Sequence, residues 1–135
     1  MISSTGHHNQ GLRLTRSMLL QVNRLGVPAA CEFGDTVTPQ FFADLLSYAS
    51  VNAQSEMLCE LVSGLSMPVG LNATVSQLAE AKAALRSAGR EQAFFGVTAH
   101  GIAGIVHAKG NTDSSLVLRG DNAVEMQTAV CIACA

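Results

Sequence analysis

Apolar side chains in the first part of the chain follow a helical spacing and then a continuous run. Between residues 11 and 25 they recur every three or four positions, and Gly26 follows, which predicts a helix that ends there. Residues 27–33 form an apolar run with the length of a buried strand. Thr38 and Pro39 then have the identities of an N-cap and a first helical residue. A helix followed by a strand–helix unit is therefore predicted.

The alternation of helix and strand continues through residue 98. Ser55 and Gly64 are placed to begin and end a helix at residues 56–63. Thr74 with Gln77 three residues later has the form of a capping box for a helix that stops at Gly89. Short apolar runs, which predict strands, lie between these helices and after the last one. They are residues 47–53, 67–71 and 92–98.

A different pattern follows residue 101. Residues 102–108 and 114–119 are two strand-like runs around the polar segment 109–113, which is typical of a hairpin with a longer loop. Four strands separated by helices predict an α/β fold with a parallel sheet and right-handed crossovers. Because ligands of such sheets bind beyond the carboxyl ends of the strands, the candidate site is expected there.

Composition narrows the class of protein. The 135 residues suffice for one domain, with residues 1–10 as a flexible tail, and 4% aromatic against 48% apolar content predicts an aliphatic core. A net charge of −2 without a basic cluster argues against nucleic acid and anionic membranes as partners. No apolar run approaches the ~20 residues of a membrane span and no signal peptide is present, which predicts a cytoplasmic protein. The four cysteines, including the C-x-x-C of Cys131 and Cys134, are expected to be free thiols.

Several stretches resemble, in the same order and at similar spacing, the middle of class I 3-deoxy-D-arabino-heptulosonate 7-phosphate (DAHP) synthase. They are residues 11–13, 26–33, 38–40, 61–65, 67–70 and 116–120. Members of this family are metal-dependent (β/α)8 barrels that condense phosphoenolpyruvate with erythrose 4-phosphate. The resemblance implies a truncated, half TIM-barrel-like domain with about four parallel strands and a hairpin. The family's metal ligands have no counterpart in the matching stretches, so we expect neither a metal nor a cofactor.

Two family motifs differ here at positions that bind phosphate. The family's Gly-Ala-Arg-Thr-Thr-Glu-Ser reads Asn52-Ala53-Gln54-Ser55 with about three residues missing, and its Gly-Phe-Lys-Asn-Gly-Thr reads Gly70-Leu71-Asn72-Ala73-Thr74. The resemblance thus implies that Gln54 replaces a phosphate-binding Arg and that Asn72 replaces a Lys that contacts phosphoenolpyruvate. Each lost cation about 4 Å from a phosphate oxygen removes about 4 kcal/mol of attraction at an effective dielectric constant of about 20. We therefore expect no DAHP synthase activity.

Five residues at predicted strand ends are candidates for the site. Glu32 is a candidate general acid or base, because partial burial at an apolar mouth would raise the pKa of its carboxyl group. His100 is the second candidate for proton transfer, and Arg119 is a candidate for binding an anionic group. Neutral Gln54 and Asn72 suit carbonyl and hydroxyl groups. Each also has a structural interpretation: Glu32 as inherited scaffold, His100 as a surface residue, Arg119 as an ion-paired residue, and Gln54 and Asn72 as relics.

Two classes of function remain open. The preferred one is a metal-free enzyme of cyclase or isomerase type that binds a small-molecule substrate in specialised metabolism. The alternative is a noncatalytic regulatory or interaction partner of a full-length DAHP synthase. A dimer-based homo-oligomer is also expected, because strands at residues 27–33 and 92–98 would leave two open sheet edges and one uncovered apolar face.

Overall fold

A four-stranded parallel sheet forms the centre of the computed structural model, which describes residues 8–98, 100–120 and 123–134. The strands lie in the order β1-β2-β3-β6, and a separate antiparallel hairpin is made by β4 and β5. The predicted α/β class, with four parallel strands and a hairpin, is therefore confirmed. The strands are β1 (Ala30–Phe33), β2 (Tyr48–Asn52), β3 (Val69–Thr74), β4 (Gln92–Val97), β5 (Ala103–Ala108) and β6 (Ser114–Arg119).

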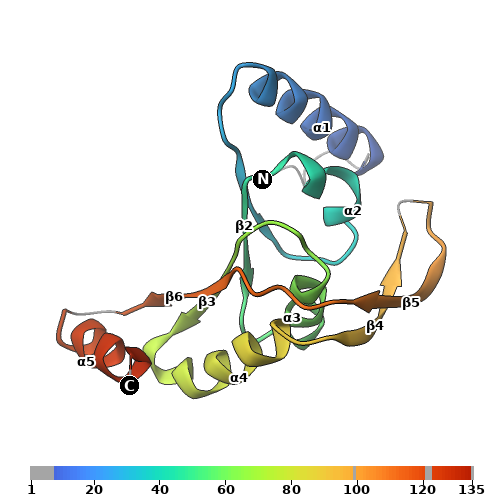
Figure 1. Ribbon diagram of the computed structural model, residues 1–135. Helices are drawn as coiled ribbons and strands as arrows, with labels where there is room; N and C mark the ends of the chain where they lie inside the picture. The colour runs from blue at the N-terminus through green and yellow to red at the C-terminus, as the bar shows by residue number, and fades with distance from the viewer. Residues whose placement is uncertain (1–7, 99, 121–122, 135) are drawn as a thin grey trace.

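The helices lie in three places around the sheet. α3 packs against α4 and β2, and α4 also packs against β3 and β6, so this pair covers one sheet face. α1 lies beside α2 and η1, whereas α5 lies at the end of β6, on the opposite side of the molecule from the β4–β5 hairpin (Figure 1). The helices are α1 (His8–Arg24), α2 (Pro39–Phe42), the 3-10 turn η1 (Ala43–Leu45), α3 (Glu56–Ser63), the 3-10 turn η2 (Val75–Gln77), α4 (Leu78–Ala88) and α5 (Ala123–Cys134).

The pairing of the last three strands differs from the prediction. Residues 92–98 were expected to give the fourth parallel strand, but β4 pairs antiparallel with β5, and β6 pairs parallel with β3 instead. The connection between β4 and β5 is tight, because the Thr98 N–H donates to the Ile102 carbonyl at 2.9 Å and Gly101 has a φ of 77°. Residues 109–113 therefore do not form a hairpin loop, and the predicted hairpin of residues 102–119 is wrong.

Asn111 explains where the chain goes after β5. Its side chain is buried and donates from Nδ2 to the Met67 carbonyl at 3.0 Å, and its backbone N–H donates to the Ala88 carbonyl at 2.8 Å. Its Oδ1 accepts the Asp113 N–H at 3.0 Å. These bonds join the segment before β6 to the residues just before β3 and just at the end of α4, so β6 enters the sheet beside β3.

The two faces of the sheet have opposite character. Ala49, Val51, Val69 and Leu71 are fully buried on the face that α3 and α4 cover, and Phe33 on the same face contacts Phe42 of α2 with ring centroids 6.1 Å apart. Side chains alternate along a strand, so the residues between them form the other face. We call this other face the open face: Ala30, Glu32, Tyr48, Ser50, Asn52, Gly70, Asn72, Thr74, Ser115, Val117 and Arg119.

The open face is polar, which corrects the expectation of uncovered apolar surface. None of its residues belongs to the large apolar side chains that are exposed in the described ranges. The first expected edge is confirmed, because β1, which lies within residues 27–33, is an outer strand of the sheet. The second outer strand is β6 rather than residues 92–98.

Helix ends follow the sequence signals at most positions. Gly64 ends α3, Gly89 ends α4, and the predicted capping box forms between Thr74 and Gln77 at η2. Thr38 makes no side-chain capping bond to α2. Its hydroxyl and its N–H instead donate to the two carboxylate oxygens of Asp35, both at 2.6 Å. Burial alone would raise the pKa of Asp35, but these bonds and one from the Val37 N–H outweigh it and lower the pKa below its usual value.

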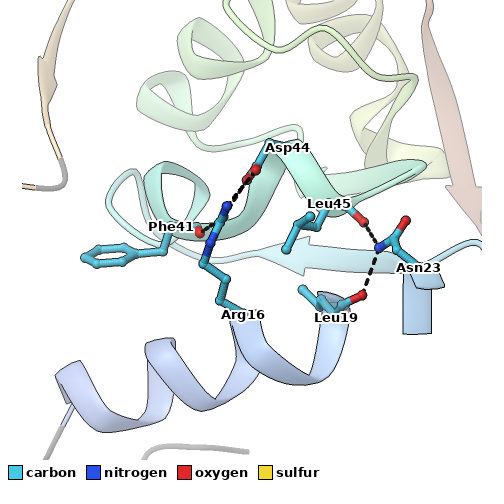
Figure 2. A network of polar contacts seen from close by, with 6 residues as sticks. All are labelled: Arg16, Leu19, Asn23, Phe41, Asp44 and Leu45. Atoms are coloured by element: carbon cyan, nitrogen blue, oxygen red, sulfur yellow. Dashed lines mark hydrogen bonds and ion pairs between the residues drawn. The ribbon is translucent and has the colours of Figure 1, made fainter. Parts of the chain in front are cut away.

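α1 is attached through polar contacts and through Leu19 and Leu12, which pack on the core, and it begins earlier than predicted. Residues 8–10 belong to this helix rather than to a flexible tail, and residues 1–7 lie outside the described ranges. Arg16 donates to both carboxylate oxygens of Asp44 at 2.7 and 2.9 Å and to the Phe41 carbonyl, and Asn23 donates to the Leu45 carbonyl at 2.9 Å (Figure 2). Leu19 alone among the described α1 residues is buried.

The remaining expectations concern membranes and cysteines. Within the described ranges no helix is long and apolar enough to cross a membrane. Cys31 and Cys59 are free, and burial, followed by neighbouring carboxylates, raises the pKa of both thiols. Cys131 and Cys134 fall in α5, but their side chains lie outside what the structure describes.

Candidate functional site

A cavity of about 220 Å³ lies at the carboxyl ends of the parallel strands. This volume is below the range of pockets for drug-sized ligands, so it suits a small metabolite. Residues from β1, β2, β3 and β6, together with the turns after β2 and β3, supply its walls. The lining consists of Glu32, Asn52, Gln54, Asn72, Ala73, Thr74, Gln77 and Arg119.

Strand register explains why these side chains converge. Asn52 pairs with Asn72, and Thr74 pairs with Arg119, so the open-face side chains stand in rows across the sheet. Glu32 lies one row lower, level with Ser50 and Gly70. The strand ends predicted from the sequence therefore bring Glu32, Gln54, Asn72 and Arg119 to one cavity.

Glu32 and Asn72 are joined by a hydrogen bond across the sheet. The Nδ2 amide of Asn72 donates to Oε1 of Glu32 at 3.1 Å. The bond fixes the carboxylate against β3, although β2 lies between the two residues' strands. Glu32 is exposed, so the partial burial on which its expected role as an acid or base depended is absent. Glu32 remains a candidate acid or base because it lines the cavity and because Asn72 holds its carboxylate in place.

The cavity lining carries one charge of each sign. Glu32 supplies a carboxylate and Arg119 supplies a guanidinium, and the other described lining residues are neutral. Arg119 is exposed, and no carboxylate pairs with it within the described part of the chain. A guanidinium with available donors binds a carboxylate or phosphate through two parallel hydrogen bonds. The site therefore suits a ligand with one anionic group.

Amide and hydroxyl groups supply the rest of the wall. Asn52 Oδ1 accepts the Gln54 N–H at 3.0 Å, which shapes the turn that presents Gln54 to the cavity. Thr74 and Gln77 line the cavity as well as forming the capping box, with the Thr74 N–H donating to Gln77 Oε1 at 3.1 Å. Four lining residues were not predicted from the sequence: Asn52, Ala73, Thr74 and Gln77. Asn52 had a usable signal, because it stands at a predicted strand end where the family motif has glycine.

His100 does not belong to this site. It lies in the turn between β4 and β5, on the opposite side of the molecule from α5 and the end of β6 (Figure 1). Its assignment to the site followed from placing residues 92–98 in the parallel sheet. Because β4 is in the hairpin, its carboxyl end leads away from the cavity, so grouping His100 with Glu32 is wrong.

The donor set does not fit a bound metal ion. Metal sites in proteins need several carboxylate, imidazole or thiolate ligands around one point. Glu32 is the one such group that lines the cavity, and the described residues hold no cluster of three or more His, Cys, Asp or Glu placed for a metal.

Comparison with known proteins assigns the family. Residues 3–132 match the model of the DAHP synthetase I family. The chain belongs to that family. It is 44% identical over 116 residues to the Phe-sensitive phospho-2-dehydro-3-deoxyheptonate aldolase of Escherichia coli K12, which covers 83% of this chain and 33% of that protein. It is 42% identical over 123 residues to the phospho-2-dehydro-3-deoxyheptonate aldolase of Haemophilus influenzae, covering 88% of this chain and 34% of that protein.

A solved member of the family supports the same assignment. The phospho-2-dehydro-3-deoxyheptonate aldolase of Francisella tularensis SCHU S4 matches 98% of this chain and 42% of its own, with a TM-score of 0.86 and 30% sequence identity. That aldolase is a TIM-barrel protein, so the four parallel strands correspond to part of such a barrel. The chain spans about a third of the length of the curated relatives it matches.

Proposed function

We propose that this family member binds a small hydroxylated monocarboxylate and acts on it without a metal, as an isomerase or cyclase. One observation carries the proposal: a single guanidinium and a single carboxylate share a cavity whose remaining polar groups are neutral amides and hydroxyls. Arg119 binds the ligand's carboxylate. Asn52, Gln54 and Asn72 then face its hydroxyl or carbonyl groups, because an amide offers both donors and an acceptor.

Charge favours such a ligand over the family's phosphorylated substrates. A phosphate dianion held by Arg119 alone lies in a cavity where Glu32 adds a negative charge. Gln54 and Asn72 stand where the family resemblance implies cations, and each absent cation removes about 4 kcal/mol of attraction at about 4 Å and a dielectric constant of about 20. A monocarboxylate carries less negative charge than a phosphate dianion, so fewer cations are needed to balance it.

Glu32 is the group proposed to move protons. In an isomerisation its carboxylate takes a proton from the hydroxyl-bearing carbon next to a ligand carbonyl and returns it to the carbonyl carbon. The hydroxyl proton passes to the former carbonyl oxygen, so no oxidant is needed. Asn72 holds Oε1 of this carboxylate, and the other oxygen, Oε2, is left for the ligand. Proton transfer by a positioned carboxyl group contributes about 10²–10⁴-fold to a rate.

Calorimetry with gluconate and with phosphoenolpyruvate tests the proposal. We expect gluconate to bind more tightly than phosphoenolpyruvate, and Arg119→Ala to weaken gluconate binding at least tenfold, because one charge-assisted bidentate contact is lost. Arg90→Ala, which removes an exposed cation outside the cavity lining, is the matched control. Tighter binding of phosphoenolpyruvate, or equal effects of the two variants, contradicts the proposal.

The same reasoning predicts no condensation of phosphoenolpyruvate with erythrose 4-phosphate by this chain. An assay with both substrates and added divalent metal checks this expectation. Turnover above background would show that Gln54 and Asn72 are compatible with the family's reaction. Copurification with a full-length DAHP synthase, without gluconate binding, would favour a noncatalytic partner role instead.

We also propose that the chain self-associates. In the four-stranded sheet, β1 and β6 each pair on one side only, and unpaired strand edges recruit other strands. Sedimentation at micromolar concentration should show a species heavier than the 14.1 kDa chain. A single species of that mass would show that the edges need no partner.

A further inference from the structure

Tyr48 stands on the open face directly below the proposed site. It is the first residue of β2, and its side chain is half-buried. A Cβ built on Gly70 would lie 1.9 Å from the Tyr48 hydroxyl and 2.8 Å from Cγ2 of Val117. The phenol therefore extends from β2 over β3 to the neighbourhood of β6. Glycine at position 70 is what allows this crossing.

The register gives the direction in which the phenol leans. Gly70 pairs with Ser50, which lies two residues after Tyr48 on the same strand. Because the Tyr48 hydroxyl reaches Gly70, the ring leans toward the carboxyl ends of the strands and hence toward the cavity. The next open-face residue above Gly70 on β3 is Asn72, which lines the cavity.

The neighbours of the phenol on the open face are small. Ser50 and Ser115 flank Gly70 in the same row, and Ala30 pairs with Tyr48 itself. Val117 lies in the row above. The cavity lining reaches down to Glu32, which stands in the same row as Gly70, and Tyr48 lies in the row below. Tyr48 is therefore the largest open-face side chain beneath the cavity lining.

We propose that Tyr48 determines the length of the ligand that the site accepts. The inference depends on the proposed function, because it takes Arg119 as the anchor of the ligand carboxylate. The Arg119–Thr74 row lies four residues above the Gly70 row, which is about 13 Å at 3.3 Å per residue. The side chains of Arg119 and Tyr48 shorten this span from both ends. Short open-chain acids anchored at Arg119 then end above the phenol, whereas longer ones reach it.

Calorimetry with aldonates of four, six and seven carbons tests the proposal in the wild-type chain and two variants. We expect Tyr48→Ala to raise the affinity for the seven-carbon acid relative to the four-carbon acid about tenfold, which is the usual discrimination available from one or two methylene-sized groups. Tyr48→Phe keeps the ring, so it should keep the wild-type preference for short acids. A hydroxyl-specific contact would instead change the preference in Tyr48→Phe as much as in Tyr48→Ala.

A second measurement checks the geometry without any ligand. Gly70→Ala should lower the melting temperature, because its new Cβ collides with the Tyr48 hydroxyl, and the decrease should be smaller in the Tyr48→Ala background. Part of the decrease persists there, since Val117 also lies close. Equal decreases in both backgrounds overturn the proposed position of the phenol.

The two proposals fail in different ways. If the wild-type chain binds none of the aldonates, the proposed function is wrong and the assignment of Tyr48 falls with it. If the wild-type chain binds them and Tyr48→Ala leaves the dependence on chain length unchanged, the inference about Tyr48 alone is overturned.

Discussion

The two faces of the central sheet use the same four strands for different purposes. On the covered face, Val51, Val69 and Leu71 are fully buried beneath α3 and α4. On the open face, the residues between them are small or polar and end at the candidate site. Burial on the first face supplies the stability, since apolar area removed from water contributes about 25 cal/mol per Å². The second face is thereby free to hold groups that bind a ligand.

The largest expected effect comes from comparing one substitution on each face of the sheet. Leu71→Ala should destabilise the chain by about 2–5 kcal/mol, because it leaves a cavity in a fully buried position. Ser50→Ala, on the open face of the neighbouring strand, should change the free energy of unfolding by about 0.5 kcal/mol or less. Urea unfolding measures both. Comparable losses would mean that the open face is also packed in solution.

The next largest effect is expected from substituting Asn111, because this residue determines that β6 completes the sheet and hence both of its faces. Asn111→Ala removes the bond to the Met67 carbonyl and leaves that buried acceptor without its partner, at a cost of about 1–3 kcal/mol. Amide hydrogen exchange should become faster in β6 than in β2. Asp113→Ala, two residues later and exposed, is the control and should leave β6 protected. Uniform loss of protection across the sheet would contradict a specific role for Asn111 in placing β6.

Local signals were sufficient for the elements, but not for the pairing of the last strands. α3, β2 and β3 lie close to their predicted bounds, because caps and apolar spacing are properties of neighbouring residues. The segment 109–113 has the composition of a hairpin loop, yet Asn111 binds Met67 and Ala88, which are distant in sequence. Patterns among neighbouring residues cannot reveal these contacts. His100 was included in the predicted site for the same reason, because residues 92–98 were placed in the parallel sheet.

The candidate site was predictable wherever it followed from strand ends. Glu32, Gln54, Asn72 and Arg119 all line the cavity because each stands at or just beyond the carboxyl end of a parallel strand. The hydrogen bond between Asn72 and Glu32 was not predictable, since β2 separates their strands and the register sets their distance. The polar character of the open face required the same register.

The smallest effect on stability is expected away from the sheet, where α1 is attached to the rest of the chain. Arg16→Ala should lower stability only slightly, because the Arg16–Asp44 pair is exposed and solvent screens it. The hydrogen bond from Arg16 lowers the pKa of Asp44 below its usual 3.8. The positive charge of Arg16 adds to this effect, and the slight burial of Asp44 opposes it. The contribution of this pair is therefore complete above pH 3.8 and is lost as the pH falls through the lowered pKa of Asp44.

Hydrogen exchange in α1 as a function of pH and salt measures this last prediction. In the wild-type chain, protection of α1 should decrease on acidification below the usual pKa of Asp44 and on raising the ionic strength, which screens exposed charges. In Arg16→Ala both dependences should weaken, while Arg13→Ala, on the same helix and exposed, should retain them. If α1 in Arg16→Ala keeps its wild-type pH and salt dependence, then burial of Leu19, and not the polar contacts of Figure 2, attaches the helix.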